Sequence, residues 1–222
     1  MVFNVGGRTL DDKPEHSFNC GGNKLEVANE YTYLGIKLKR SGSFALAIDE
    51  LYSKASRAWF AISNTIYQHK KIPTKRAFRI FDSLITPIAL YGCELWAPFS
   101  LKTDSYSSIN KLMSNWEGFG PERLNQRISR MLLSVHNKSS RLAVLGELGR
   151  NPLLLNALIH TLKYEWHLAN KAPDNSLVKH AYIEMDLATK NGVECWLDKV
   201  RKIKSCIGIA TTNAPSYGLA SN

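Results

Sequence analysis

Hydrophobic residues recur every three or four positions over residues 44–66, the spacing that places them on one face of an α-helix. These positions are Phe44, Ile48, Leu51, Tyr52, Ala55, Trp59, Ile62 and Ile66. A similar stripe begins near Thr74, and Pro87 is expected to kink or end this second helix because proline lacks the backbone N–H of a helix interior. The pattern predicts two helices joined by the loop around residues 69–73.

The first forty residues have the short apolar runs and glycine turns that are typical of β-strands. Gly21 and Gly22 lie between two such runs and predict a hairpin across residues 18–27. Residues 31–38 are expected to form one strand, in which Gly35 allows another backbone to come close.

Helix start and stop signals continue over residues 100–210. Gly120 and Pro121 open a helix, Asn151 caps another with Pro152 next to it, and Gly149 ends a short one. A further helix is expected after Ser176. The prediction is an α+β fold that is predominantly α-helical, with a short N-terminal β-hairpin, a helical bundle over 44–99, a C-terminal helical region over 100–210 and a flexible tail over 211–222.

The charge balance favours a polyanionic partner. The 222 residues include 29 Lys and Arg against 19 Asp and Glu, which gives a net charge of +10. Cations that neutralise phosphates release condensed counterions, so a basic chain of this kind suits nucleic acid. Neither a signal peptide nor an apolar run of transmembrane length is apparent, so we expect a cytoplasmic or nuclear protein and no membrane association.

Two groups of cations are candidate phosphate-binding residues. The first gathers on the loop and opening turns of the second helix, where cations oppose the helix dipole and favour an outside anion. It comprises Lys70, Lys71, Lys75, Arg76 and Arg79. The second is the row Arg123, Arg127 and Arg130 on the outer side of a later helix. Ordinary solvated surface is the alternative for the first group, and also for Lys54 and Arg57 on the first helix.

Candidate chemistry is sparse elsewhere. The common phosphate-loop, dinucleotide, metalloprotease and nucleophile-elbow motifs do not occur. Asp11 and Asp12 precede a lysine and a proline, a context typical of a turn. The cysteines are too far apart to predict a zinc site, and His160 and His167 are interpreted as partly buried polar tips. We therefore expect no catalytic residue, metal or cofactor in this chain.

Several short blocks resemble one family when they are taken together and in order. The blocks before residue 45 are Met1-Val2-Phe3-Asn4, Phe18-x-Cys20-Gly21-Gly22 with Leu25-Glu26-Val27, Tyr31-x-Tyr33-Leu34-Gly35-Ile36 and Ser41-Gly42-Ser43-Phe44. Those after it are Lys54-Ala55-x-Arg57-Ala58, Ile80-Phe81-Asp82, Pro87-Ile88-x-Leu90-Tyr91-Gly92-x-Glu94-x-Trp96 and Gly146-Glu147-Leu148-Gly149-Arg150-x-Pro152-Leu153. They resemble the region that follows the catalytic palm motifs in reverse transcriptases of non-LTR (LINE-type) retrotransposons.

The resemblance implies a division of the chain. Residues 1–43 would be the end of the palm with a primer-grip hairpin that includes Tyr31, Tyr33, Leu34 and Gly35. Residues 44–99 would be thumb-like helices that track the backbone of RNA or an RNA/DNA duplex. Tyr31 and Tyr33 are expected to pack beneath the hairpin rather than to stack on a base.

The resemblance also implies what this chain lacks. The polymerase aspartates, which use magnesium in the parent enzyme, would precede Met1, and the endonuclease domain would be missing too. Met1 is then expected to be an internal methionine of a longer protein, and the chain a non-catalytic piece of an RNA-directed DNA polymerase.

Two other functions stay open. A host could retain the chain as a protein-interaction module that grips a partner through the apolar face of residues 154–168. Alternatively, the chain has no function, and its orphaned hairpin exposes an apolar patch.

Overall fold

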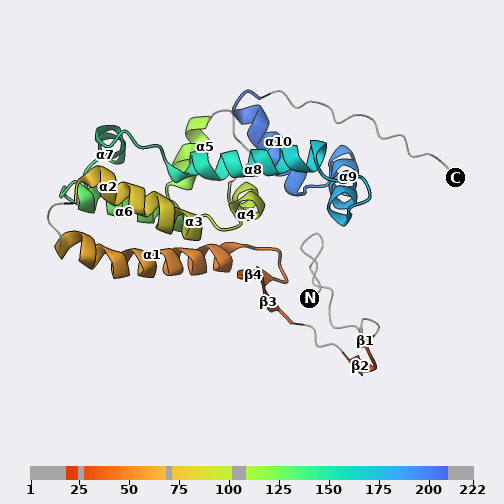
Figure 1. The fold of residues 1–222 in the computed structure, drawn as a ribbon. Coiled ribbons are helices and arrows are strands. Elements are labelled where there is room, and N and C mark those ends of the chain that lie inside the picture. Colours follow the sequence, from red (N-terminus) through yellow and green to blue (C-terminus); the bar gives the residue numbers. More distant parts are fainter. Residues whose placement is uncertain (1–18, 25–27, 69–71, 102–108, 210–222) are drawn as a thin grey trace.

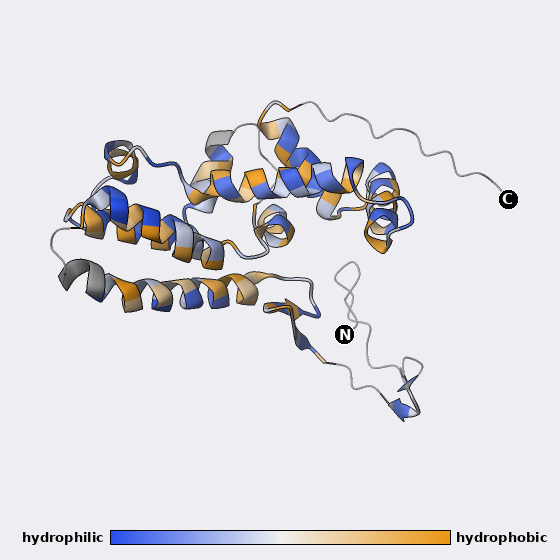
Figure 2. Cartoon of the chain, viewed as in Figure 1, coloured by the Kyte–Doolittle hydropathy of each residue, from blue (hydrophilic) through white to orange (hydrophobic). Residues whose placement is uncertain are grey.

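The computed structural model describes residues 19–24, 28–68, 72–101 and 109–209, and it is predominantly helical with short strands near the N-terminus (Figure 1). This confirms the predicted α+β class. Apolar and polar positions alternate along α1 (Ala45–Gln68) and α8 (Leu153–Asn170), as in amphipathic helices (Figure 2). Within the described ranges, no helix combines the length and apolarity needed to cross a membrane.

The strands form two small antiparallel hairpins. β1 (Asn19–Cys20) pairs with β2 (Asn23–Lys24) around the two glycines, as predicted. β3 (Glu30–Tyr33) pairs with β4 (Ile36–Lys39), so the single strand expected over residues 31–38 is wrong. The chain reverses at Leu34 and Gly35, whose φ angles are 47° and 82°. Two successive positive φ angles are those of a two-residue type I′ turn, which suits the twist of a hairpin.

The tip of the β3–β4 hairpin packs against Tyr91 and Gly92, which lie more than fifty residues further along the chain. The Tyr91 hydroxyl donates a hydrogen bond to the Leu34 carbonyl at 2.9 Å. Gly92 has a φ of +63°, and a Cβ there would lie 2.5 Å from Ile36 Cδ1. The close approach at Gly92 and the hydrogen bond from Tyr91 together fix the hairpin tip against α4 (Cys93–Ser100).

Replacing Tyr91 with phenylalanine is expected to loosen this hairpin. The exposed hydrogen bond should be worth about 0.5–1.5 kcal/mol at most, so amide hydrogen exchange in β3 and β4 should quicken while exchange in α8 is unchanged. Tyr33→Phe is the matched control, since no hydrogen bond joins its exposed hydroxyl to another described residue. Equal exchange rates in Tyr91→Phe and native protein would show that the hydroxyl does not hold the tip.

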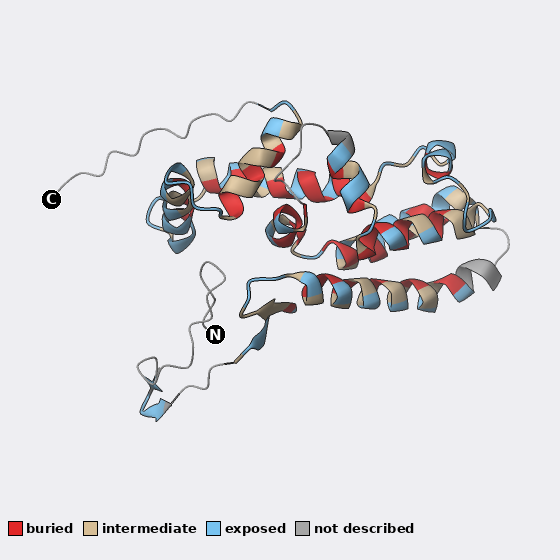
Figure 3. Ribbon diagram, turned by 180° about the vertical axis from the view of Figure 1, so that it is seen from behind, coloured by how far each residue is buried: buried red, intermediate tan, exposed pale blue. Residues whose placement is uncertain are grey.

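The first half of the helical region forms a bundle around α1. The predicted second helix comprises α2 (Thr74–Ile80), a π-helical turn η2 (Phe81–Ile85) and α3 (Thr86–Ala89), and α6 (Gly120–Leu132) packs on the same helix α1. The rings of Trp59 and Phe81 meet edge to face at 5.8 Å in its core. Buried positions of α1 form a continuous stripe toward these helices (Figure 3).

Pro87 distorts the second helix as predicted. The five-residue π-helical turn ends two residues before it, where the proline ring would meet the preceding turn of a regular helix. The wider turn accommodates the ring without ending the helix, which continues to Ala89.

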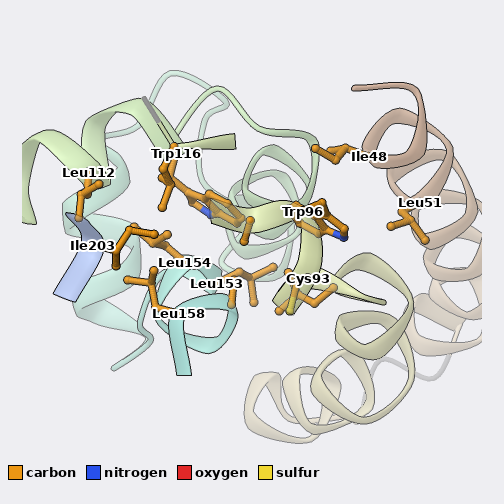
Figure 4. Packing of buried hydrophobic residues seen from close by; sticks show 14 residues of the cluster. Ile48, Leu51, Cys93, Trp96, Leu112, Trp116, Leu153, Leu154, Leu158 and Ile203 are labelled. Atoms are coloured by element: carbon orange, nitrogen blue, oxygen red, sulfur yellow. The ribbon is translucent and has the colours of Figure 1, made fainter. Parts of the chain in front are cut away.

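The second half of the helical region surrounds α8. It consists of α4, α5 (Ile109–Trp116), α9 (Leu177–Lys190) and α10 (Trp196–Cys206), whereas the short helix α7 (Arg141–Glu147) packs on α6 of the first half. Trp96 and Trp116 stack in parallel at 6.0 Å in a core that also holds Leu153, Leu154 and Ile203 (Figure 4). The same core receives Ile48 and Leu51 from the start of α1, so one apolar interior links the two halves.

Three leucines expected on the partner-binding face of residues 154–168 are not available to a partner, whereas Ile159 and Trp166 of the same segment are exposed. Leu154, Leu158 and Leu168 are all buried in the protein's own core. A face that already packs against α4 and α10 is not available to a partner without unfolding.

Candidate nucleic-acid interface

The cations of α2 lie on its solvent side. Lys75, Arg76 and Arg79 are exposed, whereas Ala77 and Phe78 of the same helix are buried against α1. Among the residues that the structure describes, no carboxylate forms an ion pair with these three side chains. Their positive charge is therefore directed to solvent and is not neutralised by any carboxylate of the described ranges.

The nearest carboxylate along this helix is already paired. Asp82 accepts two hydrogen bonds from Arg150, at 2.7 and 2.8 Å. The Arg150 guanidinium also lies over the Phe78 ring at 4.2 Å from the ring centre. This bidentate pair ties the segment after α7 to η2, and it engages Asp82, the carboxylate nearest to the α2 cations along the helix.

The three arginines of α6 have two different roles. Arg123 lies over the Tyr52 ring at 5.4 Å and Arg127 over the Phe60 ring at 4.9 Å, and both remain exposed. Rings of α1 thus hold two guanidinium groups in place at the α1–α6 junction. Arg130 instead donates to the Ser139 carbonyl at 3.2 Å, so its side chain supports the loop after α6.

The other predicted cations contribute unequally. Lys54 pairs with Glu50 at 2.9 Å, and its hydrogen bond and charge lower the pKa of that carboxyl. Arg57 is exposed on the outer side of α1. Lys70 and Lys71 lie outside the described residues.

Cations in the last three helices are mostly engaged in the fold. Lys179 is buried and donates to the carbonyls of Leu168 and Ala169, in the last turn of α8. The ion pairs there are Lys190 and Arg201 with Asp186, Lys199 with Glu194, Lys202 with Asp198, and Lys204 with Glu165. Exposed cations that form no ion pair with a described carboxylate are therefore found mainly outside these helices, on α2 and α6 and at Arg57, although Lys163 and Lys171 are further examples.

The hairpin side chains do not pack as expected. Tyr31, Tyr33 and Leu34 are 55%, 59% and 72% exposed, so the predicted burial of the two tyrosines is wrong. All four residues of β3 are exposed, whereas β4, with the buried Ile36, packs against α1. The Tyr91 ring packs against Gly35, and its Cε1 atom would lie 3.8 Å from a Cβ placed on that glycine.

An apolar groove of about 660 Å³ opens beside the hairpin. Leu34 and Tyr91 line its hairpin side, and Leu177, Val178 and Trp196 line the side of α9 and α10. Leu34, Tyr91, Leu177 and Val178 are also exposed, so the groove presents apolar surface to solvent.

One group of possible metal ligands was not predicted. Cys93, Glu94 and His160 have donor atoms that all lie within 4.8 Å of one another. Burial raises the pKa of the Cys93 thiol to about 12, and the Glu94 charge acts in the same direction. His160 and His167 are exposed, so their interpretation as partly buried tips is wrong. Sequence spacing gave no signal, because the ligands come from two helices far apart in the chain.

A scan against protein-family models found no match to this chain, and searches of the curated proteins and of the solved structures found none either. The resemblance to non-LTR reverse transcriptases remains a prediction from the residues. Asp11 and Asp12, discounted as a catalytic pair, lie outside the described residues.

Proposed function

We propose that this chain binds the sugar–phosphate backbone of RNA or of an RNA/DNA duplex, as the thumb of the reverse transcriptases it resembles would, and that it does not itself polymerise. The observation that carries the proposal is the set of exposed cations on α2 and α6 that no described carboxylate neutralises. They are Lys75, Arg76, Arg79, Arg123 and Arg127.

The chemistry of these side chains suits phosphates. Lysine and arginine on helix faces make electrostatic contacts that hold a protein in place on a nucleic acid without reading its sequence. Stacking on Tyr52 and Phe60 pre-orders two of the guanidinium groups, which reduces the side-chain entropy lost on binding. Binding should therefore be largely independent of sequence and strongly dependent on salt.

The β3–β4 hairpin supplies a second kind of contact in this proposal. Tyr31 and Tyr33 present exposed rings on a strand, and such rings stack on unpaired bases or sugars. Because Tyr91 holds the hairpin tip, the two rings would stay in a fixed position near the end of the bound nucleic-acid strand. This is the task that the resemblance assigns to a primer grip.

A salt series tests the α2 contacts. Fluorescence anisotropy with a labelled RNA/DNA hybrid would compare the native chain with Lys75→Ala/Arg76→Ala/Arg79→Ala. If all three side chains contact phosphates, the slope of log affinity against log salt should become shallower by about 2 to 3. Lys138→Ala/Lys163→Ala/Lys171→Ala removes the same charge from exposed positions outside α2 that form no ion pair with a described carboxylate, and is the matched control.

Each outcome bears on the proposal. An unchanged slope in the control and a shallower one in the α2 variant supports it. Equal slopes in both variants would mean that net charge alone attracts the hybrid, and absence of binding by the folded native chain at low salt would overturn the proposal. Partner binding unaffected by salt would favour the alternative, a protein-interaction module, now through the groove beside the hairpin rather than through α8.

A further inference from the structure

Three different metal-ligand types converge where α4 begins. Cys93 is the first residue of α4, Glu94 is the second, and His160 lies on α8, the helix that packs most extensively on α4. Cys93 lies in the core below Trp96 in Figure 4, whereas Glu94 is half-buried and His160 is exposed. The group therefore runs from the core to the surface across the α4–α8 contact.

We propose that Cys93, Glu94 and His160 bind one divalent transition-metal ion of the zinc type, with the fourth coordination position left to water or an external ligand. A thiolate, an imidazole and a carboxylate together suit Zn²⁺ or Co²⁺, whereas Mg²⁺ and Ca²⁺ prefer oxygen ligands alone. Three protein ligands with one open position are a common arrangement for zinc.

None of the three donor groups is paired with another described side chain. The Cys93 thiol interacts with the backbone of Cys93 and Glu94, and no hydrogen bond or ion pair joins the Glu94 carboxylate or the His160 ring to a described residue. Trp196 contacts Glu94 only through the backbone carbonyl, at 2.9 Å. A cation held by Cys93 and His160 would lie beside the Glu94 carboxylate and would pair with its negative charge.

The geometry needs only small side-chain movements. Ligand atoms around tetrahedral zinc lie about 3.5 Å apart, given bond lengths of roughly 2.0–2.3 Å. The three donor atoms are already within 4.8 Å of one another. The exposed His160 ring and the half-buried Glu94 side chain can rotate toward Cys93, which the core holds in place.

Binding exchanges a proton for the metal. The Sγ–H bond of Cys93 breaks, the sulfur–metal bond forms, and one proton leaves to solvent for each ion bound. No oxidant or reductant takes part. The ion would join the start of α4 to α8 one residue after Gly92, and so would strengthen the support of the β3–β4 hairpin.

Cobalt titration tests the site in the whole chain, kept reduced. Native protein should show the near-ultraviolet charge-transfer band of a thiolate–cobalt bond and visible bands of a four-coordinate ion, and zinc should displace the cobalt. Cys93→Ala should abolish the charge-transfer band. His160→Ala and Glu94→Gln should weaken binding about tenfold or more, since even indirect supports of metal ligands have effects of that size.

The controls separate this site from adventitious binding. His167→Ala removes an exposed histidine of the same helix α8 that lies outside the group, and it should leave the titration unchanged. Circular dichroism would show that each variant stays folded. Absence of a charge-transfer band in the native chain would overturn the proposal. So would an undiminished band in Cys93→Ala, or equal weakening by His167→Ala and His160→Ala.

Discussion

Replacing Glu122 with alanine is expected to lower the free energy of unfolding by about 3–5 kcal/mol, one of the largest effects available to a single substitution. Glu122 is fully buried and accepts three hydrogen bonds. The donors are the Leu153 backbone N–H at 2.8 Å, the Trp116 indole at 3.1 Å and the Asn125 amide at 3.3 Å. Alanine would leave all three donors buried without partners. Urea denaturation followed by tryptophan fluorescence measures the loss.

Glu122→Gln is the matched variant. A glutamine carbonyl can still accept from Leu153 and Trp116, and its amide would face Asn125. The Asn125 Oδ1 atom is buried and has no hydrogen-bond partner, so rotation of that amide lets it accept from the glutamine. We expect Glu122→Gln to stay within about 1 kcal/mol of the native chain. A loss in Glu122→Gln as large as in Glu122→Ala would contradict this account.

The pH dependence of these two proteins should differ in a defined direction. Burial raises the pKa of Glu122 above 4.5 in the folded chain, although its three hydrogen bonds and Arg141 act against the shift. Below pH 4.5 the carboxyl is protonated in both states. As the pH rises through the folded pKa, the unfolded chain has already released the proton, so folding loses stability. The free energy of unfolding of native protein should therefore fall with pH relative to Glu122→Gln, and a constant difference would contradict the raised pKa.

Glu122 also shows where sequence patterns fail. Asn151 and Pro152 predict the start of α8, and the helix does begin at Leu153. The predicted cap at Asn151 is wrong, because Pro152 occupies the N-cap position and the Glu122 carboxylate accepts from Leu153 N–H instead. Local sequence propensity can indicate where a helix begins. It cannot indicate which group accepts a hydrogen bond from the first N–H of the helix when that group, here the Glu122 carboxylate, comes from another helix.

The long amphipathic helices were predictable because their periodicity extends over several turns. The stripe over residues 44–66 matches α1, and Ser176 accepts from Lys179 N–H at the start of α9. The helix α4, which contains Pro98, was missed because its eight residues are too few to establish a period. The π-helical turn before Pro87 was also not predictable, since proline indicates only that a helix must bend.

The candidate site was predicted in part. Exposure of Lys75, Arg76 and Arg79 follows from the apolar stripe on the opposite face of α2. The partners of the other cations could not be foreseen, because the Arg130–Ser139 and Asp82–Arg150 contacts depend on how the helices pack. Burial of Tyr31 and Tyr33 was expected from strand propensity. That propensity describes residues of a half-buried sheet, and it does not apply to β3, which pairs only with β4 in a two-stranded hairpin.

Residues that carry the resemblance contact one another across the fold. The turn at Leu34 and Gly35 meets Tyr91 and Gly92, and Asp82 meets Arg150. Each pair joins two blocks that are more than fifty positions apart in the chain. These blocks therefore have a structural role in fixing the hairpin and η2 to the helical core, whatever the chain binds.

Gly120→Ala is expected to destabilise the chain by about 1–3 kcal/mol through overpacking. Gly120 begins α6 where it crosses α1, and a Cβ there would lie 2.8 Å from Tyr52 Cβ and 3.0 Å from Tyr52 Cγ. Rotation about the Tyr52 side chain cannot move its Cβ, so α6 must shift away from α1. This shift would also weaken the stacking of Arg123 on Tyr52.

Gly146→Ala separates that clash from helix propensity. Gly146 lies within α7, and nothing lies within 4 Å of the position of its Cβ. Alanine there should stabilise the protein by up to about 1 kcal/mol, since glycine is a poor helix former. Thermal and urea unfolding of both variants would therefore move in opposite directions. A stabilised Gly120→Ala variant would show that α6 approaches α1 less closely than these distances require.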